Sequence, residues 1–115
     1  MIEEAYCSFE VAKLLKEKGF NEPVTGLNKL LFKEGEKPIL KITHQKAMRW
    51  LREVHKVLIV IDAYHADHWE GYIDSFEIRI YSHGSTIIVP NEIAYHTNYE
   101  EAVEAALKYC LENLI

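Results

Sequence analysis

Residues 97–114, TNYEEAVEAALKYCLENL, decide the fold class of this chain more directly than any other stretch. Their apolar side chains recur at the three- and four-residue spacing that places them on one face of an α-helix. This apolar stripe consists of Val103, Ala106, Leu107, Cys110, Leu111 and Leu114. Either Thr97 or Asn98 can cap the helix, because each is followed three residues later by a glutamate. We therefore expect a folded domain whose last helix closes the core.

Two further helices are indicated upstream. Ser8 is a good N-cap for the first helix, and Gly19 is placed to end it as the glycine just beyond its last turn. Thr43 or His44 caps the second helix, and His55 marks its end. Both segments bury one apolar face and expose charged residues on the other, as surface helices of globular proteins do.

The stretch between these two helices fits neither the helical nor the strand period cleanly. A polar turn surrounds Gly35, and a short apolar segment follows it. We expect a loose hairpin around Gly35, with a short helix over Leu27 to Phe32 as the alternative.

Three strands are predicted after the second helix, at Lys56 to Asp62, Ile73 to Tyr81 and Thr86 to Val89. The first is apolar on both faces, which is typical of a central strand. The second alternates between apolar and polar residues, so one face should be buried. Residues 82–85, SHGS, form a tight turn in which Gly84 can take a positive φ.

Together these elements predict an α+β fold, with a mainly antiparallel sheet of three to five strands, two longer helices on one face and a short N-terminal helix. We expect a single globular domain over 1–115, because 115 residues is the size of one domain. The helices should bury Trp50, Leu51, Val54, Val103, Leu107 and Leu111 against Val57, Ile59, Ile61, Phe76, Ile78 and Ile80 of the strands.

Composition narrows the class of protein. The chain is 49% hydrophobic and 27% charged with a net charge of −5, which are values of a globular protein not built mainly to hold nucleic acid. Cys110 lies on the apolar stripe and should be buried, whereas Cys7 could be exposed. The acidic N-terminus is unlike a signal peptide, and the longest apolar run, Val57 to Ile61, is too short to span a bilayer. We expect a cytoplasmic protein without a membrane segment.

Three blocks of sequence resemble a known group of proteins. They are SFEVAKLLKEKGF at residues 8–20, WLREVH at residues 50–55 and YEEAVEA at residues 99–105. These blocks are similar to segments of small uncharacterised proteins encoded by phages and prophages of gut anaerobic bacteria. The stretch before the central helix, Lys41 to Thr43, departs from the tyrosines and Pro-Thr common there. The resemblance implies a small intracellular accessory protein and carries over no activity.

Metal-ligating side chains concentrate between the first two predicted strands. Asp62, His65, Asp67 and His68 could hold zinc or another divalent ion with a position left open for water. No helical His-Glu-x-x-His motif accompanies them, so a solvated polar connection is the alternative.

A basic face is predicted on the second helix. Arg49, Arg52 and Lys56 follow i, i+3, i+7 spacing and so share a face opposite Trp50 and Val54. Such a face could lie against phosphates. Because the whole chain is acidic, the solvated alternative is favoured and nucleic acid is not the expected partner.

Aromatic side chains mark a candidate partner interface. Tyr64, Trp69 and Tyr72 lie on one short connection, and Tyr and Trp are favoured in protein interfaces. Packing at the edge of the core is the alternative.

No catalytic constellation is visible in the sequence. Ser82, His83 and Ser85 are too close together to give triad geometry, and there is no phosphate-binding glycine loop. We expect a non-enzymatic interaction or accessory protein of phage or prophage type, without a cofactor, that forms a homodimer or binds a host or phage protein. The alternatives are a small metal-dependent enzyme using His65 and His68, and a weak nucleic-acid binder using the helix at 44–55.

Overall fold

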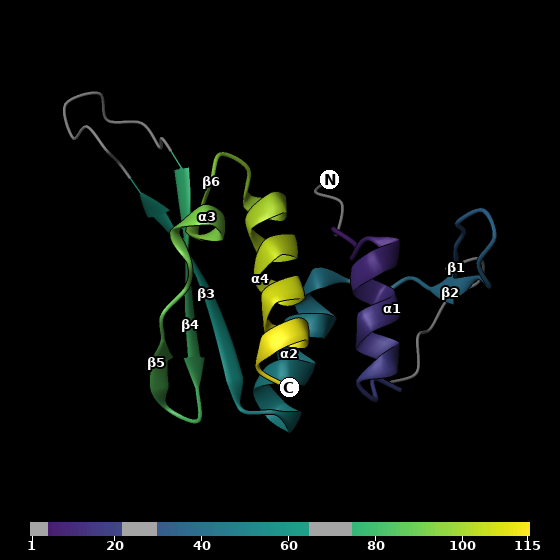
Figure 1. The fold of residues 1–115 in the computed structure, drawn as a ribbon, viewed down its shortest axis with the longest axis horizontal. Coiled ribbons are helices and arrows are strands. Elements are labelled where there is room, and N and C mark those ends of the chain that lie inside the picture. Colours follow the sequence, from purple (N-terminus) through teal and green to yellow (C-terminus); the bar gives the residue numbers. More distant parts are fainter. Residues whose placement is uncertain (1–4, 22–29, 65–74) are drawn as a thin grey trace.

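The computed structural model describes residues 5–21, 30–64 and 75–115 (Figure 1). In chain order the elements are α1 (Phe9–Glu17), β1 (Leu30–Leu31), β2 (Ile39–Leu40), α2 (His44–Val54), β3 (Val57–Tyr64), β4 (Ser75–Ser82), β5 (Ser85–Ile87), α3 (Asn91–Ala94), β6 (Tyr95–His96) and α4 (Tyr99–Asn113). The main sheet is antiparallel and two longer helices, α2 and α4, pack on one of its faces. This confirms the predicted α+β class.

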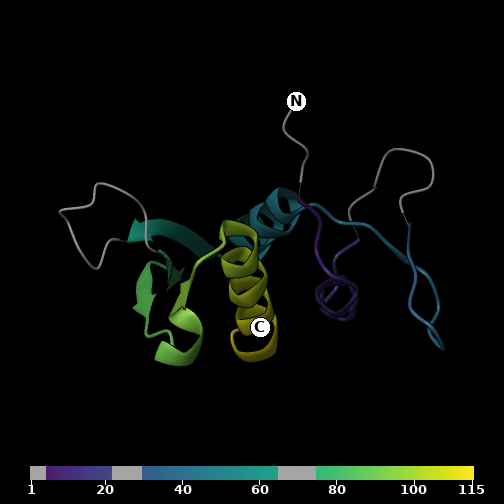
Figure 2. The ribbon, with the colours of Figure 1, turned by 90° about the horizontal axis from the view of Figure 1, so that it is seen from above.

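The elements form successive layers. Seen from above, α2 and α4 lie between the sheet and α1, and the small β1–β2 hairpin lies beyond α1 (Figure 2). That hairpin pairs Leu30 with Leu40 and Leu31 with Ile39, so the predicted loose hairpin around Gly35 is confirmed. Of the two helices α2 and α4, α4 has two apolar sides to cover, one against the sheet and one against α1.

Helix caps follow the predicted chemistry. The side-chain oxygens of Ser8, Thr43 and Asn98 each accept a hydrogen bond from a main-chain N–H in the first turn of α1, α2 and α4, at 3.2, 3.1 and 3.0 Å. Gly19 takes a φ of +102°, and the Phe20 N–H then bonds back to a carbonyl of the last helical turn at 2.9 Å. Local side chains thus define where these helices start and where α1 ends.

The centre of the sheet is β4 rather than β3. The strand order is β3-β4-β5, with β6 also pairing with β4, so the predicted central position of β3 is wrong. The chain returns to β4 twice, through the tight turn into β5 and again after α3, whereas no described segment returns to the far side of β3. A continuous apolar run is compatible with a buried strand at either place, so its composition alone did not distinguish them.

The turn between β4 and β5 confirms the predicted hairpin. His83 and Gly84 both have positive φ, 51° and 83°, as a two-residue type I′ turn requires, and Ser82 pairs with Ser85 across it. Lys56 also lies in the left-handed region at a φ of 58°, and its carbonyl accepts the His83 N–H at 2.9 Å. The end of α2, the start of β3 and the turn are therefore joined at one end of the sheet.

The predicted core is confirmed with two corrections. Of the predicted core residues, Trp50, Leu51, Val57, Ile59, Ile78, Ile80, Val103, Leu107 and Leu111 are buried. The predicted burial of Val54 is wrong, because this residue is 58% exposed. The ring of Trp50 is covered by the rings of Phe20 and His55. Cys7 is only 2% exposed, because the main chain beside it pairs with the segment before α2 and carries the thiol into the core. Within the described residues, no helix is both long and apolar enough to cross a membrane.

Candidate functional site

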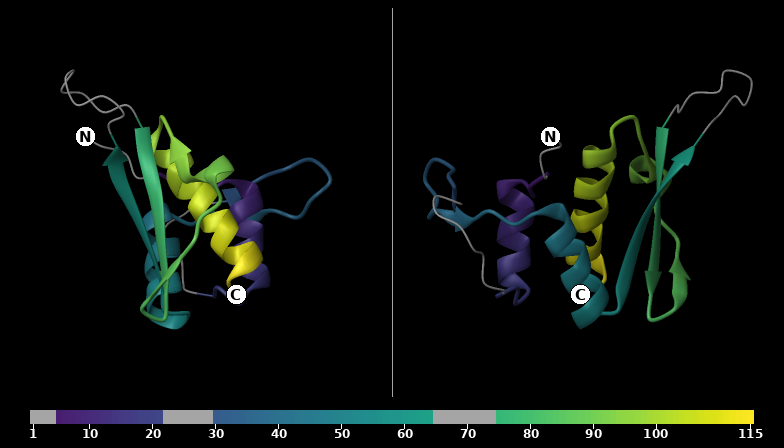
Figure 3. Two further views of the ribbon diagram at one scale, coloured as in Figure 1. Left: turned by 60° about the vertical axis from the view of Figure 1, so that its left-hand side comes forward. Right: turned by 180° about the vertical axis from the view of Figure 1, so that it is seen from behind.

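The free edge of β3 is the first candidate site. In a two-residue hairpin the two residues that flank the turn, here Ser82 and Ser85, exchange main-chain hydrogen bonds. The main-chain N–H and C=O groups of even-numbered residues in β4 therefore face β5, and those of odd-numbered residues face β3. Because odd-numbered residues of β4 pair with even-numbered residues of β3, the main-chain groups of the even-numbered residues of β3 face β4. The N–H and C=O groups that face away from β4 belong to Val57, Ile59, Ile61 and Ala63. In the left view of Figure 3, β3 forms the outer edge of the sheet.

This edge lacks the usual features that prevent strand pairing. Natural edges are protected by lysines, prolines, bulges or short length. β3 is eight residues long, and its first five residues, VLIVI, contain no charge and no proline. Leu58 is 40% exposed and Val60 is half-buried on the face without helices. The composition of a central strand is therefore found on a strand with one unpaired edge among the described residues.

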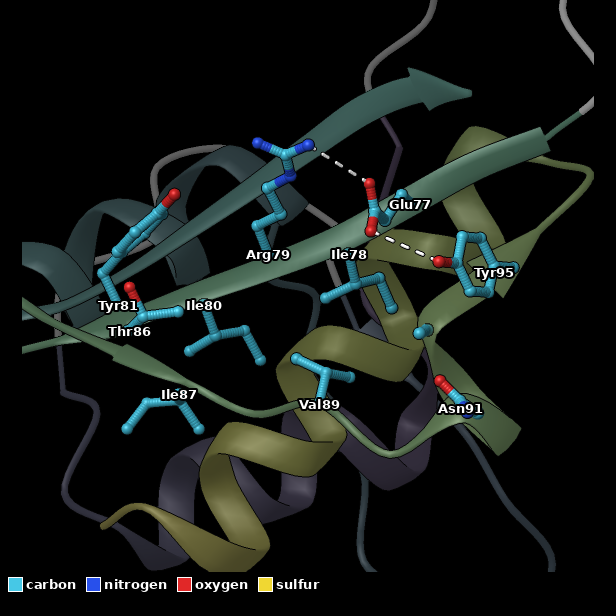
Figure 4. Close-up of a pocket in the computed structure, with 11 residues that line it drawn as sticks. Glu77, Ile78, Arg79, Ile80, Tyr81, Thr86, Ile87, Val89, Asn91 and Tyr95 are labelled. Atoms are coloured by element: carbon cyan, nitrogen blue, oxygen red, sulfur yellow. Dashed lines mark hydrogen bonds and ion pairs between the residues drawn. The ribbon is translucent and has the colours of Figure 1, made fainter. Parts of the chain in front are cut away.

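A row of polar side chains crosses the same outer face. Asp62 Oδ2 lies 3.2 Å from Arg79 Nε. Arg79 Nη2 lies 3.4 Å from Glu77 Oε1, and the Tyr95 hydroxyl donates to Glu77 Oε2 at 3.4 Å (Figure 4). The negative charge of Asp62, followed in size by that of Glu77, raises the pKa of Arg79. Because these groups are exposed to solvent, the row contributes little to stability and chiefly patterns the charge of the face.

A shallow groove of about 360 Å³ lies beside this row. It forms where β5 has ended at Ile87 and β6 has not yet begun, so neither β5 nor β6 pairs with β4 at Ile78. In Figure 4, Ile78 and Ile80 point toward α4, whereas Arg79 and Tyr81 point to the opposite side of the sheet. The groove is thus a gap in the sheet with core residues as its floor.

A buried polar cluster joins three helices on the other side of the molecule. Cys7 precedes the cap of α1, His44 is the first residue of α2, and Glu104 lies in the middle of α4. One ligand-type atom from each lies within 4.8 Å of the other two. Glu104 Oε1 is 3.0 Å from His44 Nε2 and accepts the main-chain N–H of Ser8 at 2.7 Å. His44 is 5% exposed and the Glu104 side chain 27% exposed.

Electrostatics define the protonation of this cluster. Burial raises the pKa of Glu104, but the hydrogen bonds from His44 and Ser8 outweigh it, so the pKa lies below its ordinary value. The carboxylate can only accept, so His44 Nε2 is the donor. His44 Nδ1 is buried with no hydrogen-bond partner in the described part of the chain. The pair therefore leaves one imidazole nitrogen without a partner there.

The thiol of Cys7 is not an activated nucleophile. Burial, with a smaller contribution from the nearby negative charge of Glu104, raises the pKa of the Cys7 thiol to about 12. Reactive cysteines need a lowered pKa and access to solvent, and Cys7 has neither. Cys110 also has a pKa raised to about 12, by burial alone. The cluster therefore offers ligand atoms rather than a catalytic pair.

Only one of the four predicted metal ligands lies within the described residues. Asp62 contacts Arg79, whereas His65, Asp67 and His68 lie outside the described residues, so the predicted site stays a prediction. The sequence reasoning did not find the cluster of Cys7, His44 and Glu104, because its members are distant in sequence and share no local motif. The one signal was an acidic residue within the otherwise apolar run of the last helix.

The predicted basic face begins on α2 and extends beyond it. Arg49 and Arg52 are exposed on α2, but the helix ends at Val54 and Lys56 has a left-handed φ. Lys56 therefore does not continue the helical i, i+7 spacing from which the face was predicted, and nucleic-acid binding by these residues stays a prediction.

The predicted aromatic interface lies mostly outside the described residues. The backbone of Tyr64 ends β3, while Trp69 and Tyr72 fall in the range 65–74. No family model, curated protein or solved structure matches this chain. The function is therefore inferred from the geometry.

Proposed function

We propose that this chain is a non-enzymatic interaction protein that self-associates by pairing β3 with β3 of a second copy. The observation that supports the proposal is the placement of the most apolar strand, Val57–Tyr64, at a sheet edge. Antiparallel pairing of this edge would satisfy the main-chain groups of Val57, Ile59 and Ile61 and would join two four-stranded sheets into one.

One register of the pair fits the side chains best. A two-fold axis at Ile59 places Val57 opposite Ile61 of the second copy and Leu58 opposite Val60 of the second copy, so every pair from 57 to 61 is apolar. The outward-facing main-chain groups of Val57, Ile59 and Ile61 then meet each other, as an antiparallel ladder requires. An axis at Val60 would instead place Leu58 opposite Asp62.

Charge at the two ends agrees with the same register. An axis at Ile59 brings exposed Lys56 of one copy near Asp62 of the other, and opposite charges facing across strands are favourable. The contact would be isologous, as in most homodimers. Because the described pairing surface is one strand edge and the side chains beside it, we expect an affinity in the range of weak or transient interfaces.

The expected cellular setting is part of the proposal. Both cysteines are free and buried, which suits a reducing compartment such as the cytoplasm. Together with the resemblance to phage and prophage proteins, this favours an accessory protein that acts through self-association and contact with host or phage proteins.

The test is the oligomeric state of the full chain over a range of concentrations, measured by light scattering and sedimentation. We expect a reversible dimer. The double variant L58K/V60K should be monomeric, because it places like charges opposite each other in the register centred on Ile59. The variant L58K/V60E should restore the dimer, because it places opposite charges there. Thr86→Lys is the matched control, since Thr86 is exposed on β5, the strand on the other side of β4.

The same experiment can contradict the proposal. A wild-type chain that stays monomeric at every concentration overturns self-association. A dimer that persists in L58K/V60K, or that is lost equally in Thr86→Lys, would show that another surface forms it. A dimer that L58K/V60E does not recover would contradict the register.

A further inference from the structure

We propose that Cys7, His44 and Glu104 form a binding site for one divalent cation of the zinc type. The three side chains offer a thiolate sulfur, an imidazole nitrogen and a carboxylate oxygen, which are the ligand types that zinc takes in proteins. They come from the segment before α1, from the start of α2 and from the middle of α4, so the site exists only in the folded chain.

The distances are compatible with a shared ion. In a tetrahedral zinc site neighbouring ligand atoms lie roughly 3–4 Å apart, as the metal–ligand distances of about 2.0–2.3 Å require. His44 Nε2 and Glu104 Oε1 are 3.0 Å apart, and all three ligand atoms lie within 4.8 Å of one another. Binding would require the side chains to rotate by enough to close the remaining difference.

The unsatisfied imidazole is an independent indication of a ligand. His44 Nδ1 is a buried nitrogen without a hydrogen-bond partner in the described residues, and such groups are uncommon in native proteins. A cation bound at Nδ1 would have Glu104 as the hydrogen-bonded support of the histidine, whereas His44 and Glu104 can share one ion only through Nε2. If the cation binds Nε2, it takes the place of the proton between the imidazole and Glu104.

The charges of the site suit a cation. Glu104 is ionised, and its hydrogen bonds from Ser8 and His44 both go to Oε1, so Oε2 can turn to a metal. Metal binding would release the Cys7 proton to solvent and leave a thiolate bound to the ion. The Glu104 side chain is the open side of the cluster, which gives solvent a route to it.

Such an ion would hold the first turns of α1 and α2 against the middle of α4. Its expected role is structural, because Cys7 and His44 are too buried for a substrate to reach. Binding to the folded chain alone would raise the ratio of folded to unfolded protein about 100-fold at a metal concentration 100 times the dissociation constant.

The test uses the full chain after treatment with a chelator. Cobalt(II) is titrated first, because a bound thiolate gives a sulfur-to-cobalt charge-transfer absorption, and zinc is then added to displace it. We expect saturation at one equivalent, loss of the absorption in Cys7→Ala, and a melting temperature that rises with zinc. Cys110→Ala is the matched control, because its thiol is equally buried but its raised pKa has no contribution from Glu104 or another charge. It should keep the absorption.

Three results would overturn the site. The first is a wild-type chain that shows neither the cobalt absorption nor a shift in melting temperature, and this holds whether or not any variant folds. The second is an absorption that survives in Cys7→Ala. The third is zinc binding that depends on His65 and His68, measured in a double His65→Ala, His68→Ala variant, and not on Cys7.

Discussion

Replacing Glu104 tests the role of the buried cluster in holding the helices together. Its carboxylate accepts one hydrogen bond from the Ser8 N–H at 2.7 Å and one from His44 at 3.0 Å. Hydrogen bonds to a charged group contribute about 1.5–3 kcal/mol each, and water at the open side of Glu104 replaces part of that in a variant. We expect Glu104→Ala to lower the free energy of unfolding by about 2–4 kcal/mol.

Glu104→Gln should separate charge from shape. The amide keeps an acceptor oxygen at nearly the same place, and neutral hydrogen bonds are about half as strong as charge-assisted ones. The expected loss is about 1–2 kcal/mol. The assay is urea unfolding with a chelator present, followed by circular dichroism and compared at constant m-value.

Glu112→Gln is the control for this series, because Glu112 is exposed near the end of the same helix. It should change the stability by less than about 0.5 kcal/mol. A Glu104→Ala variant as stable as the wild type would refute the reasoning, since the carboxylate would then be no more than a solvated surface group.

Three further predictions concern the core and the cluster. Leu107→Ala should cost about 2–5 kcal/mol in chemical unfolding, because Leu107 is fully buried in the core cluster; an unchanged stability would contradict this core. The folded pKa of Glu104 lies below its ordinary 4.5, so the stability that its carboxylate contributes is present above that pH and is lost as the pH falls through the folded pKa. The difference in unfolding free energy between the wild type and Glu104→Gln should therefore shrink on acidification. A difference that does not change with pH would contradict the lowered pKa. Cys7 and Cys110 should resist a thiol reagent at pH 8 until urea unfolds the chain, and rapid labelling of native Cys7 would show that it is accessible.

Features encoded by neighbouring residues were predictable from the sequence. The caps at Ser8, Thr43 and Asn98 and the turn at His83 and Gly84 depend on side chains and φ values within a few residues. The α+β class followed from the periods of the longer elements, which packing did not override.

Features that depend on distant contacts were not predictable in the same way. The edge position of β3 depends on which segments return to β4, and a single strand does not encode that. The burial of Cys7 depends on main-chain pairing with the segment before α2, 36 residues away at Thr43. The cluster with His44 and Glu104 required three helices to be assembled first, so no spacing in the sequence marked it.

The contact between the start of α1 and the middle of α4 has a consequence for synthesis on the ribosome. The hydrogen bond from Ser8 to Glu104 joins residues 96 positions apart, and α1 packs mainly on α4. At about 5–20 residues per second, α1 would wait roughly 5–20 s after its own synthesis before its partner helix exists. During that interval the apolar side of α1 lacks its main native cover, although β2 has already been made. A nascent chain stalled before α4 should therefore be a substrate for chaperones, although most of its helices and strands have already been made.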